Sequence, residues 1–297
     1  MTIASNIANG VARDVLVALK KSLREEGQNE RADSLTLKQA MEHLSKTEEG
    51  QKYYINNVAA HLINANCFYK EASSLNEGVL NMVGANKLEI DCDLLTHVAM
   101  HCAHRHNMPL VPYRAPSHMY LGSTNFPDLA FEMTAFRKDE RKGYGDPIGD
   151  GLFTTNTAKR DQGVFGKWSD HPDQLKKYGY FQPASAIDIE ASITNAVLHG
   201  RAGVAERWRD YTTYEQIADK WTSLAGKYNC PGGIMLKRSS THAYQRLAGL
   251  RTLQSKPEEA VAFERKADQY RAIADDHQDF IQTVEGVRMR LPQFIIQ

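Results

Sequence analysis

Residues 88–97 read LEIDCDLLTH, residues 108–113 read MPLVPY, residues 116–121 read PSHMYL and residues 130–134 read AFEMT. These four segments decide the fold that we expect. Apolar residues recur at helical spacing after Asp91, which predicts a helix over 92–107 with Asp91 as its N-cap. The other three segments are short, apolar and close to Pro or Gly, and they predict strands over 110–113, 119–121 and 130–133.

A cysteine, a histidine and an acid occupy defined places in this pattern. Cys92 opens the predicted helix, where free N–H groups and the positive end of the helix dipole favour a thiolate. His118 and Glu132 belong to the second and third strand segments, and a turn at 125–128 would pair these strands side by side. A histidine there can take the thiol proton, and a carboxylate can hold the imidazole.

Two further features bear on this site. Asp91 and Asp93 act against the thiolate, because a neighbouring carboxylate disfavours it unless its charge is directed at backbone N–H groups. The backbone N–H of Cys92 is one candidate donor to an oxyanion, and Asn86 is a candidate for the second donor.

The order of these segments resembles the transglutaminase-like superfamily. The residues that carry the resemblance are DCDLL at 91–95, NMPL at 107–110, APSH at 115–118 and AFEMT at 130–134. Members of this superfamily place a cysteine at a helix start, a histidine on the next strand and an acid on the one after, more often aspartate than the glutamate present here. The likeness covers residues 30–135 and is greatest to a bacterial and phage branch with tetratricopeptide-like C-terminal helices.

The resemblance implies a papain-like α+β fold, in which a helix packs on a small antiparallel sheet. It also implies that Cys92 is the nucleophile, His118 the base and Glu132 the orienting acid. The activity it implies is that of a cysteine-dependent hydrolase or acyltransferase. Such an enzyme acts on an amide or peptide bond of a peptide or protein substrate through a thioester.

We expect three parts in the chain. Residues 1–136 hold N-terminal helices and the transglutaminase-like core, residues 137–183 form an irregular glycine-rich stretch, and residues 184–297 are helical. The expected helices are Ile7–Leu23, one after Thr36, Gly50–Tyr69, Asn76–Val83, Ser185–Gly200, Tyr214–Tyr228, Ile234–Leu250 and Pro257–Val284.

The last two of these helices have the spacing of one tetratricopeptide helix pair. The residues concerned are Tyr244, Leu247, Ala248, Ala260 and Ala267. An ordinary helical hairpin explains the spacing equally well, because a lone repeat cannot bury its own face.

Composition excludes several classes of function. Lys+Arg and Asp+Glu are both 36, which does not favour a nucleic-acid or membrane surface. No secretory signal or membrane helix is expected, and the four cysteines form no disulfide framework, so we expect a cytoplasmic protein.

The histidine-rich helix raises the question of a metal site. His97, His101, His104 and His106 lie within a few residues of one another. Val98 stands where a zinc protease has glutamate, so we expect surface histidines and neither metal nor other cofactor. Cys102 lies on the apolar stripe and is expected in the core.

Two other readings remain open. One is a non-catalytic helical scaffold or interaction protein, of phage origin, on an inactive transglutaminase-like fold, with a protein partner bound through the C-terminal helices. The other is a metal-binding helical protein. Residue types alone do not separate these readings from the enzyme.

Overall fold

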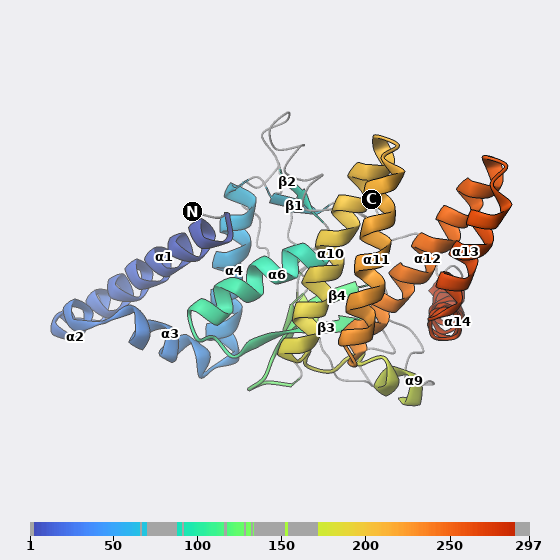
Figure 1. Ribbon diagram of the computed structural model, residues 1–297. Coiled ribbons are helices and arrows are strands. Elements are labelled where there is room, and N and C mark those ends of the chain that lie inside the picture. The colour runs from blue at the N-terminus through green and yellow to red at the C-terminus, as the bar shows by residue number, and fades with distance from the viewer. Residues whose placement is uncertain are drawn as a thin grey trace. The chain divides into compact units, whose positions relative to one another are not determined.

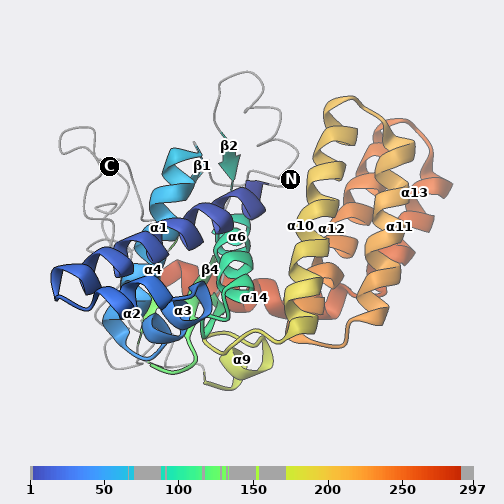
Figure 2. The ribbon, with the colours of Figure 1, turned by 90° about the vertical axis from the view of Figure 1, so that its left-hand side faces the viewer.

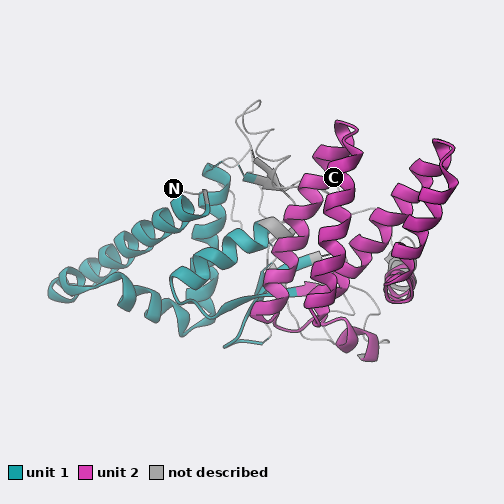
Figure 3. Ribbon diagram, viewed as in Figure 1, with its two compact units in different colours: residues 1–73, 77–113, 118–156 teal, residues 74–76, 114–117, 157–297 magenta. Residues whose placement is uncertain are grey.

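The computed structural model of the chain describes residues 3–65, 67–69, 88–90, 92–115, 118–127, 129–131, 133, 152–153 and 172–288. Helices dominate this part of the chain and a small sheet accompanies them, which confirms the broad α+β class (Figure 1). The chain divides into two compact units (Figure 3). Unit 1 holds residues 1–73, 77–113 and 118–156, and unit 2 holds residues 74–76, 114–117 and 157–297.

Over its described residues, unit 1 begins with four helices and continues through short strands and one more helix. The helices are α1 (Ile3–Glu25), α2 (Asn29–Ser34), α3 (Leu37–Ser45), α4 (Glu48–Asn64) and α6 (Cys92–Arg105). The strands are β1 (Cys67–Tyr69), β2 (Leu88–Ile90), β3 (Leu110–Ala115), β4 (His118–Ser123), β5 (Ala130–Phe131) and β6 (Leu152–Phe153). The last two residues of β3 belong to unit 2.

Local sequence signals account for most of the helix boundaries in unit 1. The side chain of Thr36 accepts a hydrogen bond from the backbone N–H of Gln39, and the Gln39 side chain accepts one from the N–H of Thr36, so the two form a capping box at the start of α3. Gly27, with φ of 79°, ends α1 in the left-handed conformation that glycine adopts without strain. The predicted helix over Gly50–Tyr69 ends earlier, at Asn64, because Cys67–Tyr69 pairs with β2 as a parallel strand.

The predicted strands and the predicted central helix are confirmed. β3, β4, β5 and β6 form one sheet in that order, and β4 pairs antiparallel with β5 and β5 with β6. α6 packs against α1, α4 and β4 (Figure 2). Gly122 in β4 allows the Tyr113 ring to approach, since a Cβ there would lie 2.3 Å from the ring. The Tyr113 ring in turn stacks on Tyr120 with centroids 5.5 Å apart.

Unit 2 is helical over its described residues from 172 onward. Its helices are α9 (Pro172–Lys177), α10 (Ala186–Arg207), α11 (Tyr211–Lys227), α12 (Pro231–Leu253), α13 (Pro257–Asp268) and α14 (Arg271–Arg288). Trp221, Tyr244 and Leu247 lie at the centre of the core between α10, α11, α12 and α13. Short connections between consecutive helices favour antiparallel neighbours. The helix pair inferred from the spacing of Tyr244 and Ala260 is present, and both side chains are buried.

Two predicted helix boundaries in unit 2 are wrong. Gly200 does not end α10, which continues to Arg207, and the glycine is buried inside the helix. The predicted helix over Pro257–Val284 is two helices, α13 and α14, separated at Gln269 and Tyr270 without a glycine or proline to mark the break. The predicted helix over Asn76–Val83 lies outside the described residues.

Within the part of the chain that the structure describes, no helix combines the length and the apolar character that crossing a bilayer requires.

Candidate functional site

The predicted catalytic residues fall at the ends of two elements of unit 1. Cys92 is the first residue of α6, and His118 is the first residue of β4. The structure therefore confirms that the cysteine opens a helix and that the histidine begins a strand. Their side chains lie outside what the structure describes, as do all atoms of Asn86, Asp91 and Glu132.

A buried hydrogen bond joins these two elements close to both residues. Thr96 lies one helical turn after Cys92 and on the same side of α6. Its Oγ1 donates to the backbone carbonyl of Met119 across 3.1 Å, and Met119 directly follows His118. Thr96 and Met119 are both almost fully buried. The hydrogen bond therefore holds the beginning of α6 beside the beginning of β4.

The strand after β4 has the orientation that the site requires. Leu121 pairs with Phe131 and Gly122 with Ala130, in antiparallel register. β5 ends at Phe131, one residue before Glu132. The antiparallel pairing predicted for these two strands is confirmed, and the meeting of the three side chains stays a prediction.

The other three cysteines are poor nucleophiles. Burial raises the pKa of the Cys67 thiol to about 11 and that of Cys102 to about 12. Burial also raises the pKa of Cys230, and Asp188 beside it adds to the effect. Because the thiolate is the reactive form, all three are held in the unreactive thiol form at neutral pH. Cys102 is buried in the core, as predicted.

The histidines of α6 divide into two groups. His101 and His104 are exposed, as expected. His97 and His106 are buried, so the expectation of surface histidines is wrong for these two. His106 lies 2.9 Å from the Tyr54 hydroxyl through its Nδ1, and this hydrogen bond lets the polar ring be buried. Among the residues described, no group of three or more His, Cys, Asp or Glu side chains is arranged to hold a metal ion.

Unit 2 contains a serine and a histidine within hydrogen-bond distance of each other, the residue types of a nucleophile and its base. Nε2 of His199 lies 2.8 Å from Oγ of Ser239. The Oδ1 atom of Asn195 accepts from the indole N–H of Trp221 across 3.1 Å, and Ser239 Oγ lies 2.9 Å from the same oxygen. An indole N–H only donates, so this atom of Asn195 is an acceptor and the Ser239 hydroxyl must donate to it.

The direction of these hydrogen bonds excludes Ser239 as a nucleophile in this arrangement. Its one hydrogen is directed at Asn195, so His199 donates its Nε2–H to the serine oxygen and cannot accept the serine proton there. The chain of hydrogen bonds instead fixes the helices α10, α11 and α12 relative to one another.

Sequence reasoning missed the residues that connect the elements. The sequence did contain a signal for Thr96: a polar residue stands one turn after Cys92, next to the apolar position Leu95. Asn195 and Ser239 gave no signal, because polar residues on a helix are usually solvated.

No family model, no curated protein and no solved structure matches this chain.

Proposed function

We propose that the chain is a cysteine-dependent acyl-transfer enzyme with a transglutaminase-like, papain-like core in unit 1. The observation that carries the proposal is the hydrogen bond from Thr96 to the carbonyl of Met119, because it joins α6, one turn after Cys92, to the residue that follows His118. Cys92 and His118 begin these two elements. A nucleophile at a helix start and a base on an adjoining strand are the elements of a thiol–imidazole pair.

The position of Cys92 supports its activation. The N–H groups in the first turn of a helix have no partner within the helix, and the dipole adds positive potential at that end. Both effects stabilise a thiolate relative to a thiol. α6 has 14 residues, long enough for the dipole to be developed at its first turn. An imidazolium at His118 would stabilise the thiolate further.

The proposed reaction has two steps. In the first, the Cys92 thiolate attacks the carbonyl carbon of an amide, and the backbone N–H of Cys92 donates to the oxygen that gains negative charge. The C–N bond then breaks, and the imidazolium of His118 gives its proton to the departing amine. In the second step, His118 takes a proton from water or from an acceptor amine, which attacks the thioester and releases Cys92. Glu132 holds the imidazole in the required orientation through both steps.

Labelling with a chloroacetamide-bearing peptide tests this proposal. We expect the probe to alkylate Cys92 at neutral pH, and peptide mapping by mass spectrometry identifies the site. The Cys92→Ala variant should lose the labelling, whereas Cys230→Ala should keep it, because burial disfavours the Cys230 thiolate. Labelling that persists in Cys92→Ala at the wild-type rate would contradict the proposal.

One observation favours the non-catalytic alternative. Four exposed apolar residues lie on one side of α10 and its C-cap residue by their spacing: Ile193, Val197, Val204 and Trp208. Trp208 is the most exposed of the four, at 77% of its surface. An apolar stripe of this kind is typical of a surface that binds a partner. If the chain is a scaffold of this type, Cys92 shows no enhanced labelling and its replacement by alanine has no effect on partner binding.

A further inference from the structure

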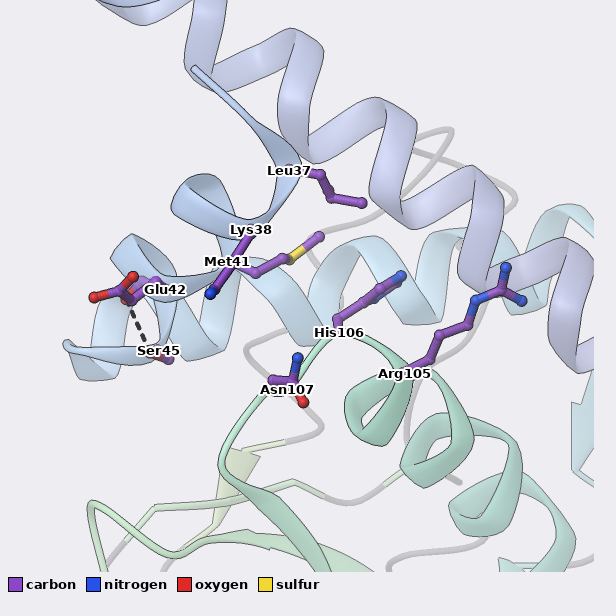
Figure 4. A pocket seen from close by; sticks show the side chains of 8 residues that line it. All are labelled: Leu37, Lys38, Met41, Glu42, Ser45, Arg105, His106 and Asn107. Carbon is purple, nitrogen blue, oxygen red and sulfur yellow. Dashed lines mark hydrogen bonds between the residues drawn. The ribbon is translucent and has the colours of Figure 1, made fainter. Parts of the chain in front are cut away.

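A cavity of about 470 Å³ lies in unit 1, between α3 and the end of α6 (Figure 4). The residues that line it are Leu37, Lys38, Met41, Glu42, Ser45, Arg105, His106 and Asn107. Its volume lies within the range of small-molecule sites, roughly 300–1,000 Å³. The cavity is at the opposite end of α6 from Cys92, so it is separated from the proposed catalytic residues by about 20 Å of helix.

His106 presents a hydrogen-bond donor at this cavity. Tyr54 is fully buried, and burial raises the pKa of its hydroxyl, so the hydroxyl keeps its proton. Its partner is Nδ1 of His106, which therefore accepts that proton in the hydrogen bond. Burial lowers the pKa of His106, and the charge of Arg105 lowers it further, so the ring is neutral. A neutral ring that accepts at Nδ1 carries its hydrogen at Nε2.

The charged residues around the cavity leave an excess of positive charge. Over the described residues, neither Lys38 nor Arg105 forms a salt bridge. Glu42 is the one acid in the lining, and Lys46 forms an ion pair with it across 2.9 Å. The hydrogen bond from Lys46 lowers the pKa of Glu42 and the charge of Lys38 contributes, so this acid is ionised and is balanced mainly by a lysine outside the lining.

The end of α6 does not offset this positive charge strongly. The carbonyls of Cys102, Ala103 and His104 accept hydrogen bonds from the N–H groups of residues 106–108. Asn107, with φ of 53°, takes the left-handed conformation that closes the helix in this way. The carbonyls that carry the negative end of the helix dipole are therefore largely paired with N–H groups of the chain itself.

Apolar surface completes the cavity. Leu37 and Met41 extend from α3 toward His106, whereas Lys38 and Arg105 lie on opposite sides of this group (Figure 4). Met41 is buried, so its side chain forms part of the floor. A ligand that fits this lining has an apolar body for Leu37 and Met41 and a negative group for the imidazole N–H, in the field of the two flanking cations.

We propose that this cavity binds a small organic anion with an apolar body, of the class of short-chain or aromatic carboxylates. Hexanoate is the probe, and hexylammonium and hexanol are its matched controls of opposite and zero charge. Full-length protein carrying ¹³C-methyl methionine reports binding through the Met41 methyl signal, which the Met41→Leu variant identifies. We expect hexanoate to shift this signal with a dissociation constant near 1 mM, roughly the value reached by ligands of this size. Hexylammonium should leave the signal unchanged.

Two charge variants and one control test the assignment. Lys38→Gln and Arg105→Gln remove exposed side chains that form no salt bridge with any described residue, so the fold should be retained. Each should weaken hexanoate binding about two- to five-fold, the effect expected of one partly screened charge. Lys20→Gln, on α1 and not part of the cavity lining, should bind as the wild type does.

Either of two results would overturn the proposal. One is the absence of a Met41 shift with hexanoate up to about 20 mM, well above the expected dissociation constant. The other is equal binding of hexanoate and hexylammonium, or unchanged affinity in both charge variants. Because Cys92 is not involved, Cys92→Ala should bind hexanoate normally, so failure of the proposed enzymatic function leaves this test intact.

Discussion

At the scale of single residues, the account depends on polar side chains that join elements inside the core. Thr96 is the clearest example, because one hydroxyl connects α6 to β4 beside both proposed catalytic residues. The sequence predicted Cys92, His118 and Glu132 from spacing and residue type. It did not predict the role of Thr96: a polar residue one turn after Cys92 was visible in the sequence, but its partner, a backbone carbonyl 23 residues away, was not.

Replacement of Thr96 by valine should destabilise unit 1. The valine fills similar space but removes the hydroxyl that donates to the buried carbonyl of Met119, and the expected loss is about 1–2 kcal/mol in the free energy of unfolding. Urea unfolding followed by circular dichroism measures it. Thr252→Val is the matched control, because the Thr252 hydroxyl donates within its own helix α12, to the carbonyl of Ala248. This substitution should cost less than about 0.5 kcal/mol. Equal losses in the two variants would contradict the structural role of Thr96.

At the scale of elements, helix starts were more predictable than helix ends. Thr36 and Pro257 precede or open helices as their residue types predict. α10 and α12 instead end with Arg209 and Ser255 in the left-handed conformation, at φ of 55° and 58°. Neither residue is the glycine that normally marks such an end, so tertiary packing, which the sequence pattern does not record, sets these boundaries.

α14 is held to the segment after α9 by a buried histidine, and this contact makes stability depend on pH. His277 lies 2.6 Å from the Tyr180 hydroxyl through Nε2 and packs against Tyr178 at a ring distance of 4.8 Å. Burial lowers its pKa to about 4, and the positive charges of Arg238 and Arg114 contribute. In the unfolded chain a histidine has a pKa of about 6.5. The unfolded state therefore takes up a proton between pH 6.5 and 4 that the folded state does not.

Stability from this residue should be complete above pH 6.5 and decrease as the pH falls toward 4. At pH 5 the expected loss relative to pH 7 is about 2 kcal/mol. Urea unfolding at both pH values measures it, and the loss should be smaller by that amount in His277→Gln. His101→Gln, which alters an exposed histidine of α6, should keep the wild-type difference. An unchanged pH difference in His277→Gln would rule out this contribution.

At the scale of the whole molecule, composition and hydrophobic pattern predicted the α+β class, the central helix and the strands of unit 1, because these follow from local periodicity. They did not predict α2 or the parallel pair of β1 and β2, whose three-residue strands pair across distant parts of the chain. The cavity beside α3 was not predicted either, since Met41 and His106 line it together only in the folded chain and are 65 residues apart in the sequence.

The central claim is that the start of α6 converts Cys92 into a thiolate with the help of His118. The rate of Cys92 alkylation by iodoacetamide as a function of pH tests it most directly, with peptide mapping to follow this one residue. We predict that the alkylation rate reaches half its maximum at a pH below about 7.5, against about 8.5 for a free thiol. In His118→Ala this midpoint should rise by about one pH unit or more. A midpoint at or above 8.5, or the same midpoint in wild type and His118→Ala, would contradict the account.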